Sequence, residues 1–321
     1  LVGSEMCIRD RNEAYVMKDG QITVSKTTIT GKEELEGAQL EVRDESNNVV
    51  DSWTSTHVPH YVSGLKEGQT YTLIETTAPD GYAKAESITF TVSNENKTVV
   101  MKDAEIIINK VDEETEEPVL DAQFSVFDME GNLIDQWITD GKAHAVSHLE
   151  AGKEYILKET KTPRGYQTVT DTAFTVSGEE DLFLEIKEKP ILVNIQVNKV
   201  DAKTKQLIKD KDFEFTLYKD PDCIYSMVAA SSKDGSATFK DLRYGTYYIK
   251  ETKAPFGYHL STEVKKVVID ENVKGDTYTF DYENTPIEIV QTGDPTNLLM
   301  IIGLGLVSMI SIIFILIKKE S

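Results

Sequence analysis

Between residues 20 and 286 the chain consists of short stretches in which hydrophobic and polar residues alternate. Ile22-Thr-Val-Ser-Lys26 and Ile88-Thr-Phe-Thr-Val92 are examples, and Gly, Asp, Asn and Pro punctuate the sequence around such stretches. A period of two sends successive side chains to opposite faces of a β-strand, so the pattern predicts antiparallel strands joined by turns. No long amphipathic helix is expected here, and the predicted fold class of this region is all-β.

The same motif recurs three times and divides this region into three units. It has the form Glu-Thr-x-x-Pro-x-Gly-Tyr and begins at Glu75, Glu159 and Glu251. Recurrence at intervals of about 80–90 residues indicates tandem domains, each of the size of a small β-sandwich. The predicted domains are residues 20–104, 105–190 and 191–286.

A different pattern occupies the C-terminal end. Leu298–Ile317 is apolar and uncharged, and Lys318 and Lys319 follow it directly. A helix of about twenty apolar residues spans the hydrocarbon core of a bilayer. We therefore expect one transmembrane helix at 298–317, with the basic tail 318–321 in the cytoplasm and the domains upstream exported.

Composition narrows the classes of function. The net charge is −21, and an acidic surface argues against nucleic acid as a partner because phosphates require a basic face. Only two cysteines are present, Cys7 and Cys223, so no disulfide framework can form. An exported chain of this kind needs large enough cores or another means of stabilisation.

Four of the five histidines fall into two close pairs, His57 with His60 and His144 with His148. Metal-binding pairs of this kind need a helix, whereas this region is predicted as strand and loop. His60 and His144 share one position of the repeat, which indicates a role in the fold. We expect no metal site and no cofactor, and the sequence contains no phosphate-binding loop or Gly-x-Ser-x-Gly motif.

Residues 1–11 read LVGSEMCIRDR and resemble the translation of a sequencing-adaptor end. We expect them to lie outside the fold. The natural protein is expected to continue further in the N-terminal direction, with a signal peptide and additional domains.

The repeated motifs resemble the Cna B-type (SpaA-like) domains of Gram-positive adhesins and pilins. They are the opening strand that ends in Lys, the segment Gly37-Ala-Gln-Leu-Glu-Val42, and the Glu-Thr-x-x-Pro-x-Gly-Tyr motif. The resemblance covers about residues 20–286 and implies tandem Ig-like or prealbumin-like β-sandwiches. It also implies an internal isopeptide bond between a Lys on the first strand and an Asn or Asp on the last strand, assisted by a Glu on a central strand.

The residue types suit this chemistry. Burial favours the neutral form of amines and of carboxyl groups, so a buried Lys becomes a nucleophile and a buried Glu can hold a proton near the acceptor carbonyl. Attack by the amine then expels water from Asp or ammonia from Asn. The resemblance implies Lys26, Glu75 and Asp103 in the first unit, and Lys199, Glu251 and Asn284 in the third.

The second unit departs from the pattern. Lys110 and Glu159 occupy the expected positions, but the acceptor position holds Glu188. Its longer side chain is expected to misplace the carbonyl group, so we do not expect the Lys110–Glu188 bond to form.

The linker at residues 287–297 resembles the sorting signal of Gram-positive surface proteins. In that family a sortase cuts between Thr and Gly of Leu-Pro-x-Thr-Gly and joins the Thr carbonyl to an amine of the cell wall or of a pilus. The resemblance implies cleavage between Thr292 and Gly293, with the apolar run as a transient anchor; a permanent membrane anchor is the alternative. The matching residues are Ile289, Val290, Gln291, Thr292 and Gly293, with Ile and Val in place of Leu and Pro.

These features together predict a stalk or adhesin fragment that is extracellular and anchored to the cell wall. Its expected partners are sortase and peptidoglycan, and a host or matrix ligand would bind the missing N-terminal region. Two alternatives stay open. In the first the chain is a sortase-polymerised pilin subunit, and in the second it is the wall spacer of a surface enzyme whose catalytic domain is missing.

Overall fold

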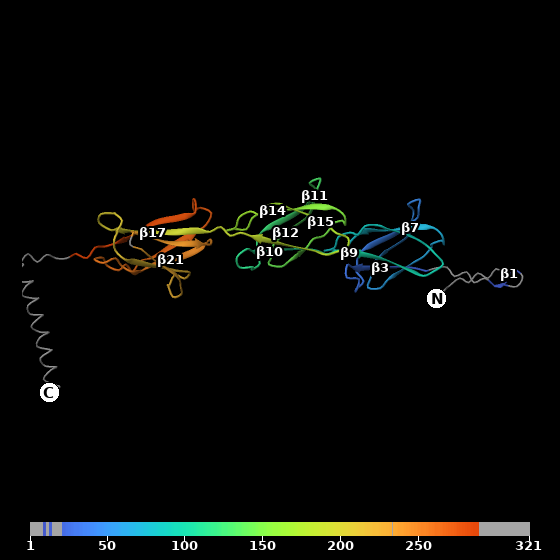
Figure 1. The fold of residues 1–321 in the computed structure, drawn as a ribbon, viewed down its shortest axis with the longest axis horizontal. Helices are drawn as coiled ribbons and strands as arrows, with labels where there is room; N and C mark the ends of the chain where they lie inside the picture. Colours follow the sequence, from blue (N-terminus) through green and yellow to red (C-terminus); the bar gives the residue numbers. More distant parts are fainter. Residues whose placement is uncertain (1–8, 11–12, 15–20, 233, 289–321) are drawn as a thin grey trace, which may run out of the picture. The chain divides into compact units, whose positions relative to one another are not determined.

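The computed structural model describes residues 9–10, 13–14, 21–232 and 234–288, and within them every helix or strand element is a β-strand (Figure 1). These residues form two compact units, of which the first ends at Leu192 and the second begins at Val193. The first unit contains two β-sandwich domains and the second contains one. The predicted all-β class is confirmed.

The C-terminal predictions concern a part of the chain outside this description. The sorting residues 289–293 and the apolar run 298–317 are not among the described residues. Within the described ranges, no helix is long and apolar enough to cross a membrane.

The first domain packs a three-stranded sheet, in the order β6-β3-β9, against a four-stranded sheet, in the order β5-β4-β7-β8. A separate short pair, β1 and β2, precedes it. The strands are β1 (Arg9–Asp10), β2 (Glu13–Ala14), β3 (Ile22–Thr28), β4 (Gln39–Arg43), β5 (Val49–Thr54), β6 (His60–Val62), β7 (Thr70–Thr77), β8 (Ile88–Thr91) and β9 (Lys97–Asp103).

The second domain repeats this arrangement with sheets β13-β10-β16 and β12-β11-β14-β15. Its strands are β10 (Ile106–Asp112), β11 (Gln123–Asp128), β12 (Leu133–Ile138), β13 (His144–Ala145), β14 (Glu154–Lys161), β15 (Thr172–Thr175) and β16 (Leu182–Glu188).

The third domain has sheets β20-β17-β23 and β19-β18-β21-β22. Its strands are β17 (Val193–Asp201), β18 (Phe213–Tyr218), β19 (Ser226–Ser232), β20 (Ser236–Leu242), β21 (Gly245–Lys253), β22 (Val264–Ile269) and β23 (Thr277–Asn284).

In each domain the first long strand pairs in parallel with the last, as β3 with β9, β10 with β16 and β17 with β23. The prediction of antiparallel strands is therefore wrong for this pair. Parallel strands need a long connection between them, and here the rest of the domain provides it. The pairing brings Lys26 opposite Met101 and places Asp103 two residues further along the same inward face.

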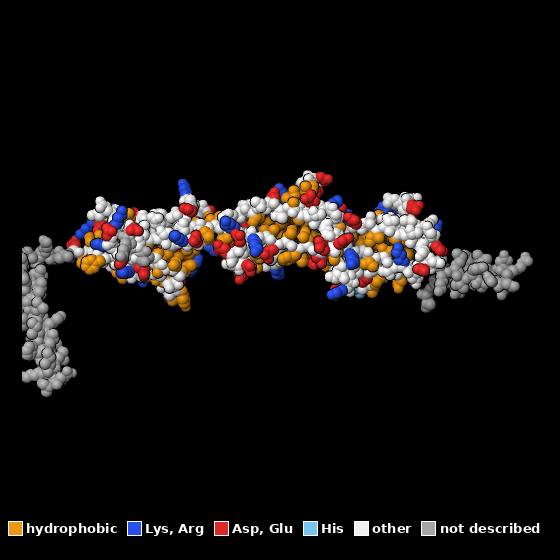
Figure 2. Space-filling model, viewed as in Figure 1, with side chains coloured by type: hydrophobic (Ala, Val, Ile, Leu, Met, Phe, Trp, Pro, Cys, Tyr) orange, Lys and Arg blue, Asp and Glu red, His pale blue; other side chains and the backbone are white. Residues whose placement is uncertain are grey.

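On β7 of the other sheet, the inward-facing side chains are apolar with one exception. On β7, Tyr71 and Leu73 are buried in the core, and Glu75 follows them on the same face. This alternation is the period of two in the sequence, and it carries a glutamate into the interior. Figure 2 shows acidic, basic and hydrophobic side chains interspersed over the visible face of the described domains.

Within the first unit, the two domains share a hydrogen-bonded joint. The backbone N–H of Lys84 donates to Leu149 O, and the N–H of Ala151 donates to Lys84 O, both at 2.8 Å. The Lys84 Nζ also lies 3.1 Å from Glu150 Oε1. A parallel β-bridge between the two domains therefore fixes this contact.

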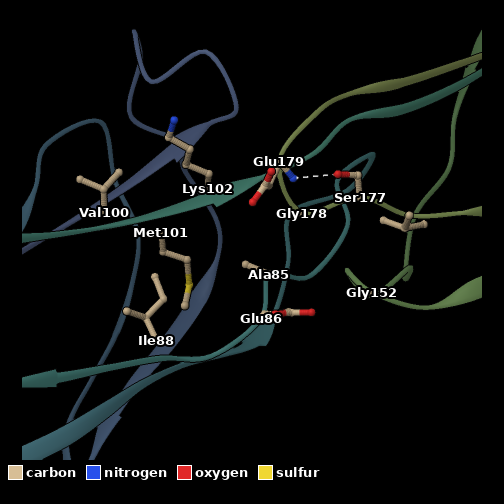
Figure 3. Close-up of a pocket in the computed structure, with 11 residues that line it drawn as sticks. Ala85, Glu86, Ile88, Val100, Met101, Lys102, Gly152, Ser177, Gly178 and Glu179 are labelled. Atoms are coloured by element: carbon tan, nitrogen blue, oxygen red, sulfur yellow. Dashed lines mark hydrogen bonds between the residues drawn. The ribbon is translucent and has the colours of Figure 1, made fainter.

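A groove of about 500 Å³ lies beside the joint (Figure 3). Its charged lining residues are Glu86, Lys102 and Glu179. The Glu179 N–H donates to Ser177 Oγ at 3.0 Å, so this part of the lining is hydrogen-bonded within its own loop. The buried charged side chains, by contrast, lie in the cores of the domains.

Candidate site: a buried lysine, glutamate and acceptor in each domain

Each domain buries one lysine, although lysine is almost never fully buried unless it is paired. The exposed fractions are 2 % for Lys26, 4 % for Lys110 and 0 % for Lys199. All three lie on the first strand of the parallel pair. A buried amine needs an opposite charge or a neutral form, and the surrounding residues show which of these is available.

A glutamate from the opposing sheet faces each lysine. These glutamates are the ones that begin the repeated motif, and their side chains are fully buried. The Nζ–Oε1 distances are 3.0 Å for Lys26–Glu75, 3.2 Å for Lys110–Glu159 and 2.5 Å for Lys199–Glu251.

The second oxygen of each glutamate is held by the backbone. In every domain an N–H ten residues further along donates to Oε2, which leaves Oε1 directed at the lysine. The donors are Ala85 N at 2.7 Å, Val169 N at 3.0 Å and Ser261 N at 2.7 Å.

A register shift lies beside each glutamate as well. In the first domain it falls between Gln39 and Leu40, and Leu40 pairs with Glu75. The other two domains have the same irregularity in β11 and β18. A β-bulge changes the direction of nearby side chains. Sequence analysis missed this feature, because no residue type marks it and it appears only when the two strands are paired.

The third domain supplies an amide as acceptor. Lys199 Nζ donates to Asn284 Oδ1, and Asn284 is 1 % exposed. The Asn284 Nδ2 donates to both oxygens of Glu251 at 2.9 Å and to His259 O at 2.9 Å. Lysine, glutamate and amide therefore form one closed hydrogen-bonded set.

The first domain supplies a carboxyl group in the same place. Lys26 Nζ donates to Asp103 Oδ1, and Asp103 is fully buried. Burial raises the pKa of Asp103 to about 7, with the Glu75 charge acting in the same direction and Lys26 opposing both. At neutral pH a large fraction of this carboxyl group is therefore protonated.

The second domain also brings its three residues together. Glu188 is fully buried, and its Oε2 contacts Lys110 Nζ. Although its side chain is longer, Glu188 has the same register as the other acceptors, and its Oε2 lies against the amine.

Burial acts on the amines in the opposite sense. It lowers the pKa of Lys199 to about 8 against the opposing effect of Glu251, and it also lowers the pKa of Lys110. Aromatic rings contribute to this desolvated setting, since Lys199 Nζ lies 4.4 Å from the centre of the Tyr282 ring. A neutral, nucleophilic amine is thus accessible near neutral pH.

Comparison with known proteins identifies the family of the three domains. Residues 20–105, 104–190 and 193–286 match the SpaA domain, described as a prealbumin-like fold domain. The chain belongs to the SpaA family. Its three SpaA domains confirm the family that the repeated motifs indicated.

Individual relatives overlap with the chain to different extents. The trypsin-resistant surface T6 protein of Streptococcus pyogenes serotype M6 is 32 % identical over 112 residues, which are 35 % of this chain and 19 % of that protein. The Bacillus anthracis TIE protein is 26 % identical over 83 % of this chain and 51 % of its own, with a TM-score of 0.46. BcpA, the major pilin subunit of Bacillus cereus, is 17 % identical over 84 % of this chain and 100 % of its own, with a TM-score of 0.29. The chain thus spans about half of one of these relatives and a fifth of another, and the family assignment rests on the three matched domains.

The tyrosine of the Pro-x-Gly-Tyr turn has a defined role in two SpaA domains. The Tyr166 hydroxyl donates to Asp112 Oδ2 at 2.8 Å, and the Tyr258 hydroxyl donates to Asp201 Oδ2 at 2.9 Å. Each aspartate follows the buried lysine by two residues. The turn is thereby fixed to the end of the lysine strand, a contact that sequence analysis did not identify.

Two SpaA domains also contain an edge cluster of His, Asp and Trp. The His60 ring stacks on Trp53 with centroids 4.0 Å apart, and its Nε2 lies 3.0 Å from Asp51 Oδ2. His144, Trp137 and Asp135 repeat this geometry in the second domain. Each cluster joins the edge strands of the two sheets. In the described part of the chain no group of residues has the arrangement of a metal site.

Proposed function

We propose that this chain is the covalently cross-linked stalk of a Gram-positive surface protein. One observation carries the proposal: in the SpaA domains, a lysine of the first strand and an acceptor of the last strand meet beside a buried glutamate. A bond at this point joins the two ends of the domain directly. The proposed bonds in the first and third domains are Lys26–Asp103 and Lys199–Asn284.

In the third domain the reaction exchanges one amide for another. The neutral amine of Lys199 attacks Cγ of Asn284, the new C–N bond forms, and the bond to Nδ2 breaks. Glu251 Oε1 lies 2.5 Å from the amine and 2.9 Å from Nδ2, so it can accept the proton of the first and deliver it to the second. Ammonia leaves, and no external reactant is needed.

In the first domain the same attack releases water. The protonated carboxyl group of Asp103 is the electrophile, because a carboxylate resists attack by an amine. Glu75 lies 3.0 Å from the Lys26 amine and is positioned to carry its proton to the departing hydroxyl group. Each site reacts once and the chain is its own substrate, so this is not turnover by an enzyme.

The bonds suit a protein under tension. Lys26 and Asp103 are 77 residues apart in the sequence, and their bond would let a pulling force bypass the strands between them. Closing such a loop contributes roughly 4–5 kcal/mol by analogy with a disulfide of similar span. The bonds would serve in place of a disulfide framework, which two cysteines cannot form.

We further propose that sortase displays the chain on peptidoglycan, extracellularly, by cleavage between Thr292 and Gly293. The segment Leu298–Ile317 would hold the chain in the membrane until transfer. The proposal rests on the sequence of residues 289–321. Cell fractionation tests it: the wild-type chain should appear in the wall fraction and Thr292→Ala should stay with the membrane. Equal membrane retention of both forms would leave a permanent anchor.

Two other roles are compatible with the same domains. The chain would be a pilin subunit if sortase joins copies of it, or a wall spacer if a catalytic domain precedes it. If the chain is the stalk of an adhesin, a host or matrix ligand would bind a region N-terminal to residue 1. Immunoblots of wall extracts separate the first case, because polymerisation gives a ladder of sortase-dependent, detergent-resistant multimers.

Mass spectrometry of the denatured chain tests the cross-links. The first domain should be lighter than its sequence by one water, and the third by one ammonia. Peptide mapping assigns each loss, because Lys26 and Lys199 should be found in branched peptides. Recovery of both lysines in linear peptides from the folded chain would overturn the proposed function.

A further inference from the structure

The second SpaA domain contains the acceptor that differs from the other two. We propose that this domain closes its own covalent bond, an amide between Lys110 Nζ and Cδ of Glu188. The inference rests on the cross-linking chemistry proposed above and extends it to a glutamate acceptor, which side-chain length alone would exclude.

The backbone places Glu188 where the other acceptors are. Asp112, two residues after Lys110, pairs with Glu188, as Thr28 pairs with Asp103 in the first domain. The two parallel pairs therefore have the same register. The side chain of Glu188 is longer by one methylene group, and its Oε2 contacts the Lys110 amine.

The residue opposite the lysine differs between the second and third domains. Lys199 pairs with Tyr282, whose ring covers the amine, whereas Lys110 pairs with Ile186. Isoleucine is the smaller side chain and has no ring to cover the amine. The Phe124 ring still covers Lys110 Nζ from the other side, at 4.5 Å.

The unlinked state of this site satisfies its polar atoms poorly. Lys110 Nζ lies 3.2 Å from Glu159 Oε1 and also contacts Glu188 Oε2, whereas Glu188 Oε1 has no hydrogen-bond partner among the described residues. In the third domain, by contrast, Asn284 Nδ2 donates to both oxygens of Glu251. Two carboxyl groups share one amine in the second domain, and a buried oxygen without a partner is costly.

Amide formation removes this imbalance. The neutral amine of Lys110 attacks Cδ of protonated Glu188, the C–N bond forms, the C–O bond to the hydroxyl group breaks, and water leaves. Glu159 Oε1 lies 3.2 Å from the amine, so it can take the amine proton and deliver it to the hydroxyl group. One amine and one carboxyl group become a neutral amide whose N–H can donate to Glu159.

Burial of the amine also favours amide formation, since it lowers the pKa of Lys110 and raises the neutral fraction of the amine. The competing state is a permanent buried ion pair of the same three residues. Such a pair would keep both lysine and glutamate recoverable as separate residues. The two states therefore differ in covalent mass, which makes the choice between them experimental.

The test is peptide mapping of the full chain after folding, by tandem mass spectrometry. We expect Lys110 and Glu188 in one branched peptide, with the loss of one water, in most of the folded chains. Glu188→Gln should link with loss of ammonia instead, so its linked product has the same mass as linked wild type although the two sequences differ in mass. Lys110→Arg cannot form the amide and should restore the unmodified mass of this domain.

Glu185→Gln is the matched control, because Glu185 lies on the same strand with its side chain 42 % exposed, and it should leave the bond unchanged. Linear peptides for Lys110 and Glu188, together with branched peptides for Lys26 and Lys199, would overturn this inference alone. Linear peptides for all three lysines would overturn it together with the proposed function. The wild-type result decides the case even if a variant fails to fold.

Discussion

The second and third domains place the same lysine and glutamate in the same positions, yet their acceptors leave the cores in different states. In the third domain, Asn284 donates to Glu251 and accepts from Lys199, so every polar atom of the site is used. In the second, Glu188 adds a second carboxyl group and removes the donor. The register of the parallel strands thus determines which residues meet, whereas the acceptor determines whether they are satisfied without reaction.

The largest effect is expected from removing the glutamate of the third domain, where every polar atom of the site has a partner. Glu251→Ala should abolish the link in the third domain, because nothing then carries the proton from Lys199 to the leaving ammonia. The link closes a loop of 85 residues and contributes roughly 4–5 kcal/mol, and an uncompensated buried amine costs a further 3–5 kcal/mol or so. Calorimetry should show the transition of the third domain lowered or absent, and mass spectrometry should show the ammonia retained.

Glu283→Ala is the control for this variant, since Glu283 lies on the same strand with its side chain 50 % exposed and pairs only at the surface. It should keep the link and shift the transition by little. An unchanged link in Glu251→Ala would contradict the assigned role.

The acceptors can be exchanged. Glu188→Asn gives the second domain the amide of the third, and the expected result is a link between Lys110 and the introduced side chain. This link should form with loss of ammonia, more quickly than the wild-type link, because an amide needs no protonation to be an electrophile and supplies the donor that Glu159 lacks. Refolding from denaturant with timed acid quenching and mass analysis measures both rates. A slower reaction in the variant would show that the length of the acceptor side chain, and not the hydrogen bonding of the buried polar atoms, determines the rate of linking.

The acceptors should also differ in their response to pH. The reaction in the first domain needs a neutral amine together with protonated Asp103, whose pKa is about 7. Above that value the gain in neutral amine is offset by the loss of the protonated carboxyl group, so linking in the first domain should not accelerate as the pH rises beyond about 7. Asn284 does not ionise, and the pKa of Lys199 is about 8, so linking in the third domain should accelerate as the pH rises towards 8. Timed refolding at a series of pH values between about 7 and 8, with each domain read by its own peptide, should show acceleration in the third domain only. Equal acceleration of the two domains would contradict the assignment.

The smallest expected effect concerns the edge clusters that the third domain does not share in this form. His60→Ala removes a stacked ring pair and a hydrogen bond to Asp51, which together stabilise by about 1–2 kcal/mol. The chain has only two tryptophans, and both lie in these clusters, so tryptophan fluorescence during denaturation reports on them selectively. His57→Ala, whose side chain is 82 % exposed, should leave the transition unchanged. Equal shifts in the two variants would argue against a role of the cluster.

Much of the fold was readable from local patterns. The period of two in segments such as Ile22–Lys26 predicted the strands, and the repeated motif predicted three domains. The resemblance to Cna B-type domains implied the glutamates on their central strands. The parallel pairing of the first and last strands was not readable, because it joins residues some 80 positions apart and depends on how the whole sandwich closes. The bulge beside each glutamate and the tyrosine–aspartate contacts escaped prediction for the same reason.

The sequence by itself determined the residue types of the site: a lysine, a glutamate and an acid or amide, each on an alternating strand that buries one face. Side-chain alternation is a local property, so it needs no partner strand to be recognised. Only the tertiary structure decided that Glu188 reaches Lys110, because the position of a carboxyl group in a core depends on the register of two distant strands and on the volume left by their neighbours.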